Sequence, residues 1–146
     1  MVIVRQILKS KGKQVYSVTP RTSIIDVLKY MADKETGAVL VMEGEKVVGI
    51  FSERDYARRV TLKGCAMDAP VDDAMTKAVY YIGPDQTTDE CMVQMTDKRI
   101  RHLPVVENGK VIGVISIGDV VKAIISDQKS TITGMENYIL GRDYNQ

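Results

Sequence analysis

The sequence predicts a mixed α/β (α+β) fold built from two similar β-α-β-β-α units. The first observation is an internal repeat, because a shift of 64 places superposes residues 18–60 on residues 82–124 without a gap, and 11 of these 43 positions are identical. The second is a common order in both copies: a helical pattern, an apolar run, a polar turn and another apolar run. The third is size, because each copy is too small to bury both faces of its own sheet. We therefore expect the two copies to pack together as one unit.

Each copy begins with a short β-rich run that ends at a proline, Pro20 or Pro84, and continues into a helix. In the first copy Ile24, Val27, Leu28 and Met31 follow the spacing of one buried helical stripe. In the second copy Thr87-Thr88-Asp89-Glu90 is the pattern of a capping box, in which a Thr hydroxyl and the Glu carboxylate satisfy free amides at the helix start.

Two strands follow each helix, at 39–42 and 47–51 in the first copy and at 103–106 and 111–115 in the second. Asn108-Gly109 indicates a tight hairpin, because both residues tolerate positive φ angles. A last helix begins near Asp55 or Asp119.

The repeat sets the expected boundaries: a first repeat with a leading segment at 1–62, a linker over 61–70, a second repeat at 71–127 and a C-terminal helical tail at 128–146. Val4–Leu8 resembles Val71–Met75, which predicts a short helical piece before each repeat. Thr133-Gly134-Met135-Glu136 has the pattern of another capping box, so we expect one extra helix in the tail.

Composition excludes several functions. The formal charge of +1 lacks the basic excess that grips nucleic acid or anionic membranes, and no apolar run reaches the roughly 18 residues of a membrane span. We expect a cytoplasmic protein.

Cys65 and Cys91 have no metal-ligand spacing, and we expect Cys91 in the core and Cys65 in a loop. No nucleophile lies beside an oriented base and no G-x-G-x-x-G turn is present, so the sequence predicts neither an enzyme nor a metal site.

Two segments carry the functional signal: Gly49-Ile50-Phe51-Ser52-Glu53-Arg54-Asp55 and Gly113-Val114-Ile115-Ser116-Ile117-Gly118-Asp119. Each is a strand ending in Ser, with an Asp three residues later at the start of a helix. A fixed carboxylate there can accept hydrogen bonds from both hydroxyls of a ribose, while the Ser hydroxyl and the helix-start amides face an anion. The alternative is that both Asp residues only cap their helices, which is the more common role of a single Ser-x-x-Asp.

This duplicated Gly-h-h-Ser-x-x-Asp pattern (h, hydrophobic), together with Leu103-Pro104-Val105-Val106 after Arg101-His102, resembles the repeats of cystathionine-β-synthase (CBS) domains. The resemblance covers almost the whole chain. It implies a tandem pair, or Bateman module, whose two repeats are related by pseudo-twofold symmetry with two clefts between their sheets. In this family the clefts take AMP, ADP, ATP, S-adenosylmethionine or NAD(H).

The resemblance also implies which residues would contact a nucleotide. Ser116 and Asp119 would face Thr36, Gly37 and Ala38, while Ser52 and Asp55 would face Ile100, Arg101 and His102. Two further segments, Val15-Tyr16 and Ala78-Val79, would add to the adenine wall. Because the first repeat has Gly37-Ala38 where the second has Arg101-His102, we expect the two clefts to differ in phosphate binding.

Alternatives remain for the charged residues. His102 is either a protonatable neighbour of the ligand or an ordinary strand histidine. Arg54, Arg58 and Arg59 either clamp a diphosphate or form a solvated helix face. Similarity to stand-alone bacterial CBS-pair proteins, some of which hold AMP and a nicotinamide dinucleotide, extends that ligand pair to this chain.

The sequence therefore predicts a regulatory module that senses an adenosine nucleotide and signals to an unknown partner protein. The alternative is a ligand-free dimerisation or scaffold module. Val120, Val121, Ile124 and Ile125 exceed what one face of a short helix needs, which favours a homodimer unless all four are internal core.

Overall fold

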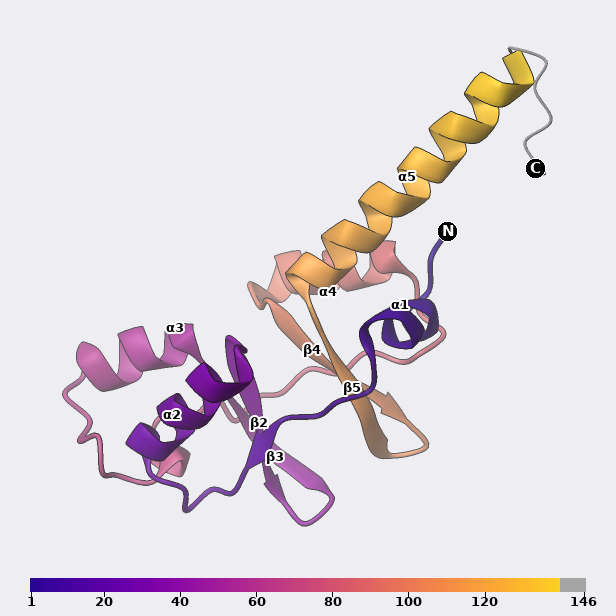
Figure 1. Cartoon of the computed structure of the whole chain (residues 1–146). Helices are drawn as coiled ribbons and strands as arrows, with labels where there is room; N and C mark the ends of the chain where they lie inside the picture. Colours follow the sequence, from indigo (N-terminus) through magenta and orange to yellow (C-terminus); the bar gives the residue numbers. More distant parts are fainter. Residues whose placement is uncertain (140–146) are drawn as a thin grey trace. The chain divides into compact units, whose positions relative to one another are not determined.

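The structure is a computed structural model that describes residues 1–139 (Figure 1). It confirms the mixed α+β fold and the repeated order of elements. The first repeat contains β1 (Ser17–Val18), α2 (Ile24–Lys34), β2 (Ala38–Glu43), β3 (Lys46–Ser52), α3 (Glu53–Asp55) and one π-helical turn, η1 (Tyr56–Thr61). The second contains α4 (Thr88–Lys98), β4 (His102–Glu107), β5 (Lys110–Ser116) and α5 (Ile117–Ile139). Before the repeats lie α1 (Val4–Lys11) and a short 3-10 turn, η2 (Val71–Asp73).

The first sheet has the order β1-β2-β3, with β1 parallel and β3 antiparallel to β2. One face of this sheet is covered by α2 and η1, because Val39 and Val41 of β2 share a buried cluster with Ile24 and Val27 of α2 and Val60 of η1. The helical stripe expected from Ile24, Val27, Leu28 and Met31 is confirmed.

The start of α2 is fixed by its cap and by the linker. Ser23 is the N-cap, and its hydroxyl accepts a hydrogen bond from the Asp26 amide. The amides of Ile24 and Ile25 donate to the carbonyls of Ala69 and Met67 in the linker. These bonds satisfy backbone donors that have no partner inside the helix, so the linker is part of the first unit's packing.

In the second repeat the hairpin of β4 and β5 turns at Asn108 and Gly109, whose φ angles of 53° and 77° confirm the predicted turn. The first strand of this repeat is reduced to a single bridge between Ile82 and Val105. The Thr87 hydroxyl caps α4, as predicted, but the Glu90 carboxylate accepts from the Gln86 side chain instead of closing the capping box. Cys91 is fully buried, and Cys65 is a half-buried loop residue, as expected.

The compact units of the structure exchange the leading segments of the two repeats. Residues 14–81 and 107–112 form one unit, whereas residues 1–13 and 82–106 join the chain from Gly113 onward in the other. The amides of Val4 and Arg5 donate to the carbonyls of Gln86 and Pro84 in the second repeat, and the Val71 amide donates to Thr22 in the first. Sequence boundaries at 1–62 and 71–127 follow the repeat, but the packing of the leading segments crosses them.

A glycine in each hairpin explains where the leading segments dock. A Cβ placed on Gly113 would lie 2.6 Å from Leu8 Cδ2 of α1, and one placed on Gly49 would lie 2.5 Å from Met75 Sδ. Leu8 and Met75 are both almost completely buried. Each glycine therefore leaves the space that one large apolar side chain fills.

The prediction of a separate helix beginning near Thr133 is wrong. Helix α5 runs without a break from Ile117 to Ile139, so the second repeat's last helix and the described part of the tail are one element. The physical reason is that the segment 127–133 holds no Gly or Pro that would stop a helix, and a single helical glycine, Gly134, costs only about 1 kcal/mol. Residues 140–146 lie outside the described residues.

Loss of the space at Gly113 should destabilise the protein. We expect Gly113→Val to lower the free energy of unfolding by about 1–3 kcal/mol, because Leu8 must leave its site. The matched control is Gly134→Ala, where nothing lies within 4 Å of the added methyl group and a gain of about 0.5–1 kcal/mol is expected. Chemical denaturation measures both.

The same experiment has an internal check. The double variant Gly113→Val/Leu8→Ala should lose clearly less stability than the sum of the losses in the two single variants, because the smaller side chain at position 8 makes room for the valine. Full additivity would show that Leu8 does not occupy this space.

Candidate functional site

We call each Ser-x-x-Asp segment, which joins a strand end to a helix start, a closure. In the first closure Ser52 and Asp55 hydrogen-bond to each other. Asp55 Oδ2 accepts from the Ser52 amide at 3.0 Å and from its hydroxyl at 3.2 Å, while the Ser52 hydroxyl accepts from the Asp55 amide. Asp55 Oδ1 accepts from the Thr76 hydroxyl at 2.8 Å, and Arg59 Nε lies 3.7 Å away. The residue is only 8% exposed. Both oxygens of this carboxylate are thus engaged, as in a structural cap.

The second closure, formed by Ser116 and Asp119, has the same frame but a different environment. Asp119 Oδ2 accepts from the Ser116 amide at 2.8 Å, and the Ser116 hydroxyl accepts from the Asp119 amide at 3.1 Å. Lys11 of α1 donates to Asp119 Oδ2 at 2.5 Å and also to the carbonyl of Val114. All of these bonds to the carboxylate end on Oδ2, and the Asp119 side chain is 24% exposed. Oδ1 therefore remains the oxygen that can accept from a ligand.

The electrostatics keep Asp119 ionised and His102 neutral. Burial alone would raise the pKa of Asp119, but the hydrogen bonds from Lys11 and Ser116 and the charge of Lys11 outweigh it, so the pKa lies below its ordinary value. For His102, burial and then the positive charge of Lys11 lower the pKa, against an opposing effect of Asp119. At neutral pH the second closure thus presents a carboxylate beside an uncharged imidazole.

The segments that open β2 and β4 lie beside the closure of their own repeat. The Gly37 carbonyl accepts from the Glu53 amide at 3.0 Å, and the Arg101 carbonyl accepts from the Ile117 amide at 2.8 Å. Thr36 and Ala38 are joined by their own hydrogen bond, from the Thr36 hydroxyl to the Ala38 carbonyl. Ile100 is half-buried and Arg101 is exposed. That each segment also faces the closure of the other repeat stays a prediction.

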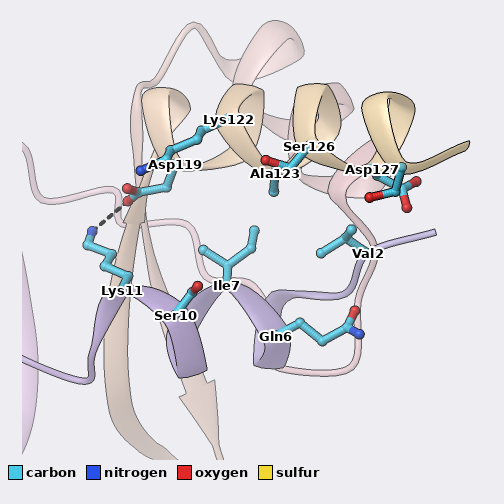
Figure 2. Close-up of a pocket in the computed structure, with 11 residues that line it drawn as sticks. Val2, Gln6, Ile7, Ser10, Lys11, Asp119, Lys122, Ala123, Ser126 and Asp127 are labelled. Atoms are coloured by element: carbon cyan, nitrogen blue, oxygen red, sulfur yellow. Dashed lines mark hydrogen bonds and ion pairs between the residues drawn. The ribbon is translucent and has the colours of Figure 1, made fainter. Parts of the chain in front are cut away.

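A pocket adjoins the second closure, between α1 and α5 (Figure 2). Its volume is about 450 Å³, within the range of small-molecule sites. Of the residues predicted from the sequence only Asp119 lines it, at the end where Figure 2 shows the contact with Lys11. Ser10, Lys122 and Ser126 add polar groups to its walls.

A second pocket lies beside the first closure. Its volume is about 630 Å³, and its lining includes Ala78 from the predicted adenine wall together with Arg59 and Thr76, which bind Asp55. The rest of the predicted wall is half-buried: Val15, Tyr16 and Val79. Tyr16 packs edge to face on Tyr30, with the Lys34 ammonium 5.9 Å from each ring.

The three arginines near Asp55 do not act alike. The Arg59 side chain makes its contacts within the first unit: it lies beside Asp55 and donates to the Met75 carbonyl at 2.7 Å. Arg54 of α3 and Arg58 of η1 are exposed. Exposure alone fits both a phosphate clamp and a solvated helix face.

Sequence reasoning missed the two residues that make the closures different, Lys11 and Thr76. Both come from the leading segments, which were expected only as extra helical pieces. A usable signal was the parallel between Val4–Leu8 and Val71–Met75, because Thr76 directly follows one and Lys11 closely follows the other.

Two further findings concern residues 1–139. No helix in this range is long and apolar enough to span a membrane. The same part of the chain brings together no group of three or more His, Cys, Asp or Glu side chains that could hold a metal ion.

Comparison with known proteins agrees with this geometry. The family model described as the CBS domain matches the chain twice, at residues 4–61 and 71–126. A mitochondrial CBS domain-containing protein of Arabidopsis thaliana, CBSX3, is 32% identical over 148 residues, which cover 94% of this chain and 72% of that protein. A solved structure of a protein with CBS domains from Burkholderia ambifaria is 48% identical, with a TM-score of 0.83, and covers 87% of this chain and 96% of that one.

A more distant solved structure shares the fold. It is a CBS domain protein from Pyrobaculum aerophilum complexed with AMP, 22% identical, with a TM-score of 0.72 over 81% of this chain and 89% of that one. The two matches of the family model, one on each copy of the repeat, together with these similarities, show that the chain belongs to the CBS domain family, as a pair of CBS domains.

Proposed function

We propose that this CBS pair is a non-catalytic regulatory module that binds an adenosine nucleotide and signals its occupancy to a partner protein. The observation that carries the proposal is the carboxylate of Asp119. It is ionised, oriented through Oδ2 by Ser116 and Lys11, and able to accept further hydrogen bonds through Oδ1. Such a group suits the vicinal hydroxyls of a ribose.

The charges around Asp119 favour a nucleotide over a nucleoside. Asp119 lies in the first turn of α5, where the helix amides favour negative charge, and the exposed guanidinium of Arg101 belongs to the segment bonded to that turn. A phosphate near Arg101 would gain charge-assisted hydrogen bonds. The remaining residues predicted from the sequence, including His102, keep their proposed roles as ligand contacts.

The two closures are proposed to play different parts. Asp55 is buried and both of its oxygens already accept hydrogen bonds, so we place the stronger ribose site at Asp119. AMP is the ligand we favour, because the Pyrobaculum aerophilum protein of the same fold is complexed with it. NAD(H) is the second ligand proposed, and a homodimer in the cytoplasm is the proposed working form.

A panel of nucleotides tests the proposal as a whole. AMP, ATP, S-adenosylmethionine and NADH should be compared by thermal shift, with uridine monophosphate as a control of equal phosphate charge. A ligand at about 100 times its Kd should stabilise the fold by about 2.7 kcal/mol. If no adenosine compound shifts the melting temperature more than uridine monophosphate does, the module is a ligand-free scaffold.

Asp119 and Asp55 should respond differently to the same substitution. We expect Asp119→Asn to weaken AMP binding about 10- to 100-fold, since a charged acceptor is lost, while the melting temperature falls less than for Asp55→Asn, because only a part-exposed ion pair is lost. Asp55→Asn should lower the melting temperature, because a buried carboxylate with Ser, Thr and Arg partners loses its charge. Calorimetric titration and thermal melts measure the two effects.

A ligand variant sharpens this test. Wild-type protein should bind 2′-deoxy-AMP less tightly than AMP, whereas Asp119→Asn should bind the two about equally. An undiminished preference for AMP in that variant would move the ribose contact away from Asp119.

Arg101 should act on the phosphate. We expect Arg101→Ala to reduce affinity for AMP more than for adenosine, by about tenfold or more, because a charge-assisted hydrogen bond is removed. Arg21→Ala, at another exposed arginine, is the control and should leave both affinities unchanged. Equal losses for AMP and adenosine would place Arg101 away from the phosphate.

A further inference from the structure

Helix α5 carries an exposed apolar stripe along most of its length. Val121, Ile125, Ile132, Met135 and Ile139 are between 40% and 76% exposed. Figure 1 shows the C-terminal half of α5 extending past α1 and α4, the helices of its own unit that it packs against. Val120, which the sequence analysis placed in a dimer patch, is instead fully buried. The stripe is therefore separate from the core of the unit.

The spacing of the stripe is that of a coiled coil. With Gln128 included, successive members follow at steps of four, three, four, three and four residues, the pattern of alternating a and d positions. Ala123, Ser126 and Ser130, which line the pocket against α1, lie on the opposite side of the helix by the same periodicity. One face of α5 thus serves its own unit and the other is suited to a second helix.

The stripe is complementary to itself when a second α5 runs in the opposite direction. An antiparallel register that places Val121 opposite Ile139 also places Ile125 opposite Met135 and Gln128 opposite Ile132. Every a position then meets a d position of the other helix. A contact of this kind uses the same surface on both chains and closes as a twofold dimer.

The charges beside the stripe favour the antiparallel over the parallel orientation. Lys122, Lys129 and Glu136 occupy the e positions that flank it, and in the antiparallel register Glu136 lies between Lys122 and Lys129 of the second helix, nearer to Lys122. In a parallel pair Glu136 would meet the uncharged Thr131 at the facing g position, and Lys129 would meet the apolar Ile124. Only the antiparallel arrangement pairs opposite charges.

From this match we infer that the C-terminal half of α5 binds the α5 of a second copy of this chain as an antiparallel two-helix coiled coil. The inference deepens the proposed homodimer but does not depend on nucleotide binding. The occupant of the stripe is the same helix of another chain, with Ile132 and Met135 near the centre of the contact.

A charged residue within the stripe should separate the copies. We expect Ile132→Asp to convert the dimer to a monomer near 16 kDa in sedimentation at micromolar concentration, while Thr133→Asp, one residue away on the other side of the helix, leaves it dimeric. Both variants should keep the wild-type thermal shift with AMP, if the wild type shows one, because the change lies far along α5 from Asp119. A monomeric wild type, or a dimer that survives Ile132→Asp, overturns the inference whatever the nucleotide result.

Orientation is tested by charge reversal and by cross-linking. Glu136→Lys should weaken the dimer, and the added change Lys122→Glu should restore it. Ile125→Cys and Met135→Cys, made in separate chains and mixed under mild oxidation, should give a disulfide-linked heterodimer. Each variant alone should give little linked product. Self-linking of the Met135→Cys chain would indicate a parallel pair and contradict the antiparallel register, and capture of a different protein by a monomeric chain would replace the second copy as the occupant.

Discussion

The reciprocal hydrogen bonding between a serine at the end of a strand and an aspartate at the start of a helix holds each repeat together at its functional end. The serine hydroxyl satisfies a helix-start amide, and the aspartate carboxylate satisfies the serine amide. The last residue of β3 or β5 and the first turn of α3 or α5 are thereby fixed together. Any ligand contact made by the carboxylate is added to this frame, because one of its oxygens is already committed to the backbone.

The leading segments determine which carboxylate oxygens of each closure already have hydrogen-bond partners. Around Asp55 the segment after η2 supplies Thr76, whose hydroxyl satisfies the second oxygen of the carboxylate. Around Asp119 α1 supplies Lys11, which adds a cation but shares the oxygen that Ser116 already binds. One aspartate is therefore buried with hydrogen bonds to both oxygens, and the other is ion-paired through one oxygen and partly exposed. The difference in phosphate binding expected from Arg101-His102 and Gly37-Ala38 thus has a second source, the residues Lys11 and Thr76 of the leading segments.

Local signals predicted the elements well, and contacts distant in sequence explain what they missed. The stripe of Ile24, Val27 and Met31 and the Asn108-Gly109 turn depend on neighbouring residues only, so both could be predicted. The docking of Leu8 on Gly113 joins residues more than one hundred positions apart, and no local pattern carries that information. The expected helix start at Thr133 was wrong because a capping pattern works only where the preceding chain leaves the helix, and α5 does not. For the site, the sequence identified the two closures, but the partners of their carboxylates depended on the packing of the leading segments.

Lys11 also ties the candidate site to helix α5, the element that carries the exposed stripe. It lies at the end of α1, donates to the Val114 carbonyl of β5 and binds Asp119 in the first turn of α5. A ribose that binds Oδ1 of Asp119 would share the carboxylate with Lys11 on Oδ2, and a phosphate nearby would attract the same ammonium, so a nucleotide would weaken the contact that ties α1 to α5. Because α5 is one uninterrupted helix, its first turn at the candidate site and the exposed stripe belong to the same element. Coupling between nucleotide and assembly would require the two arrangements of Lys11 to differ also in their affinity for a second copy, and the unchanged AMP shift expected of Ile132→Asp corresponds to the case in which they do not.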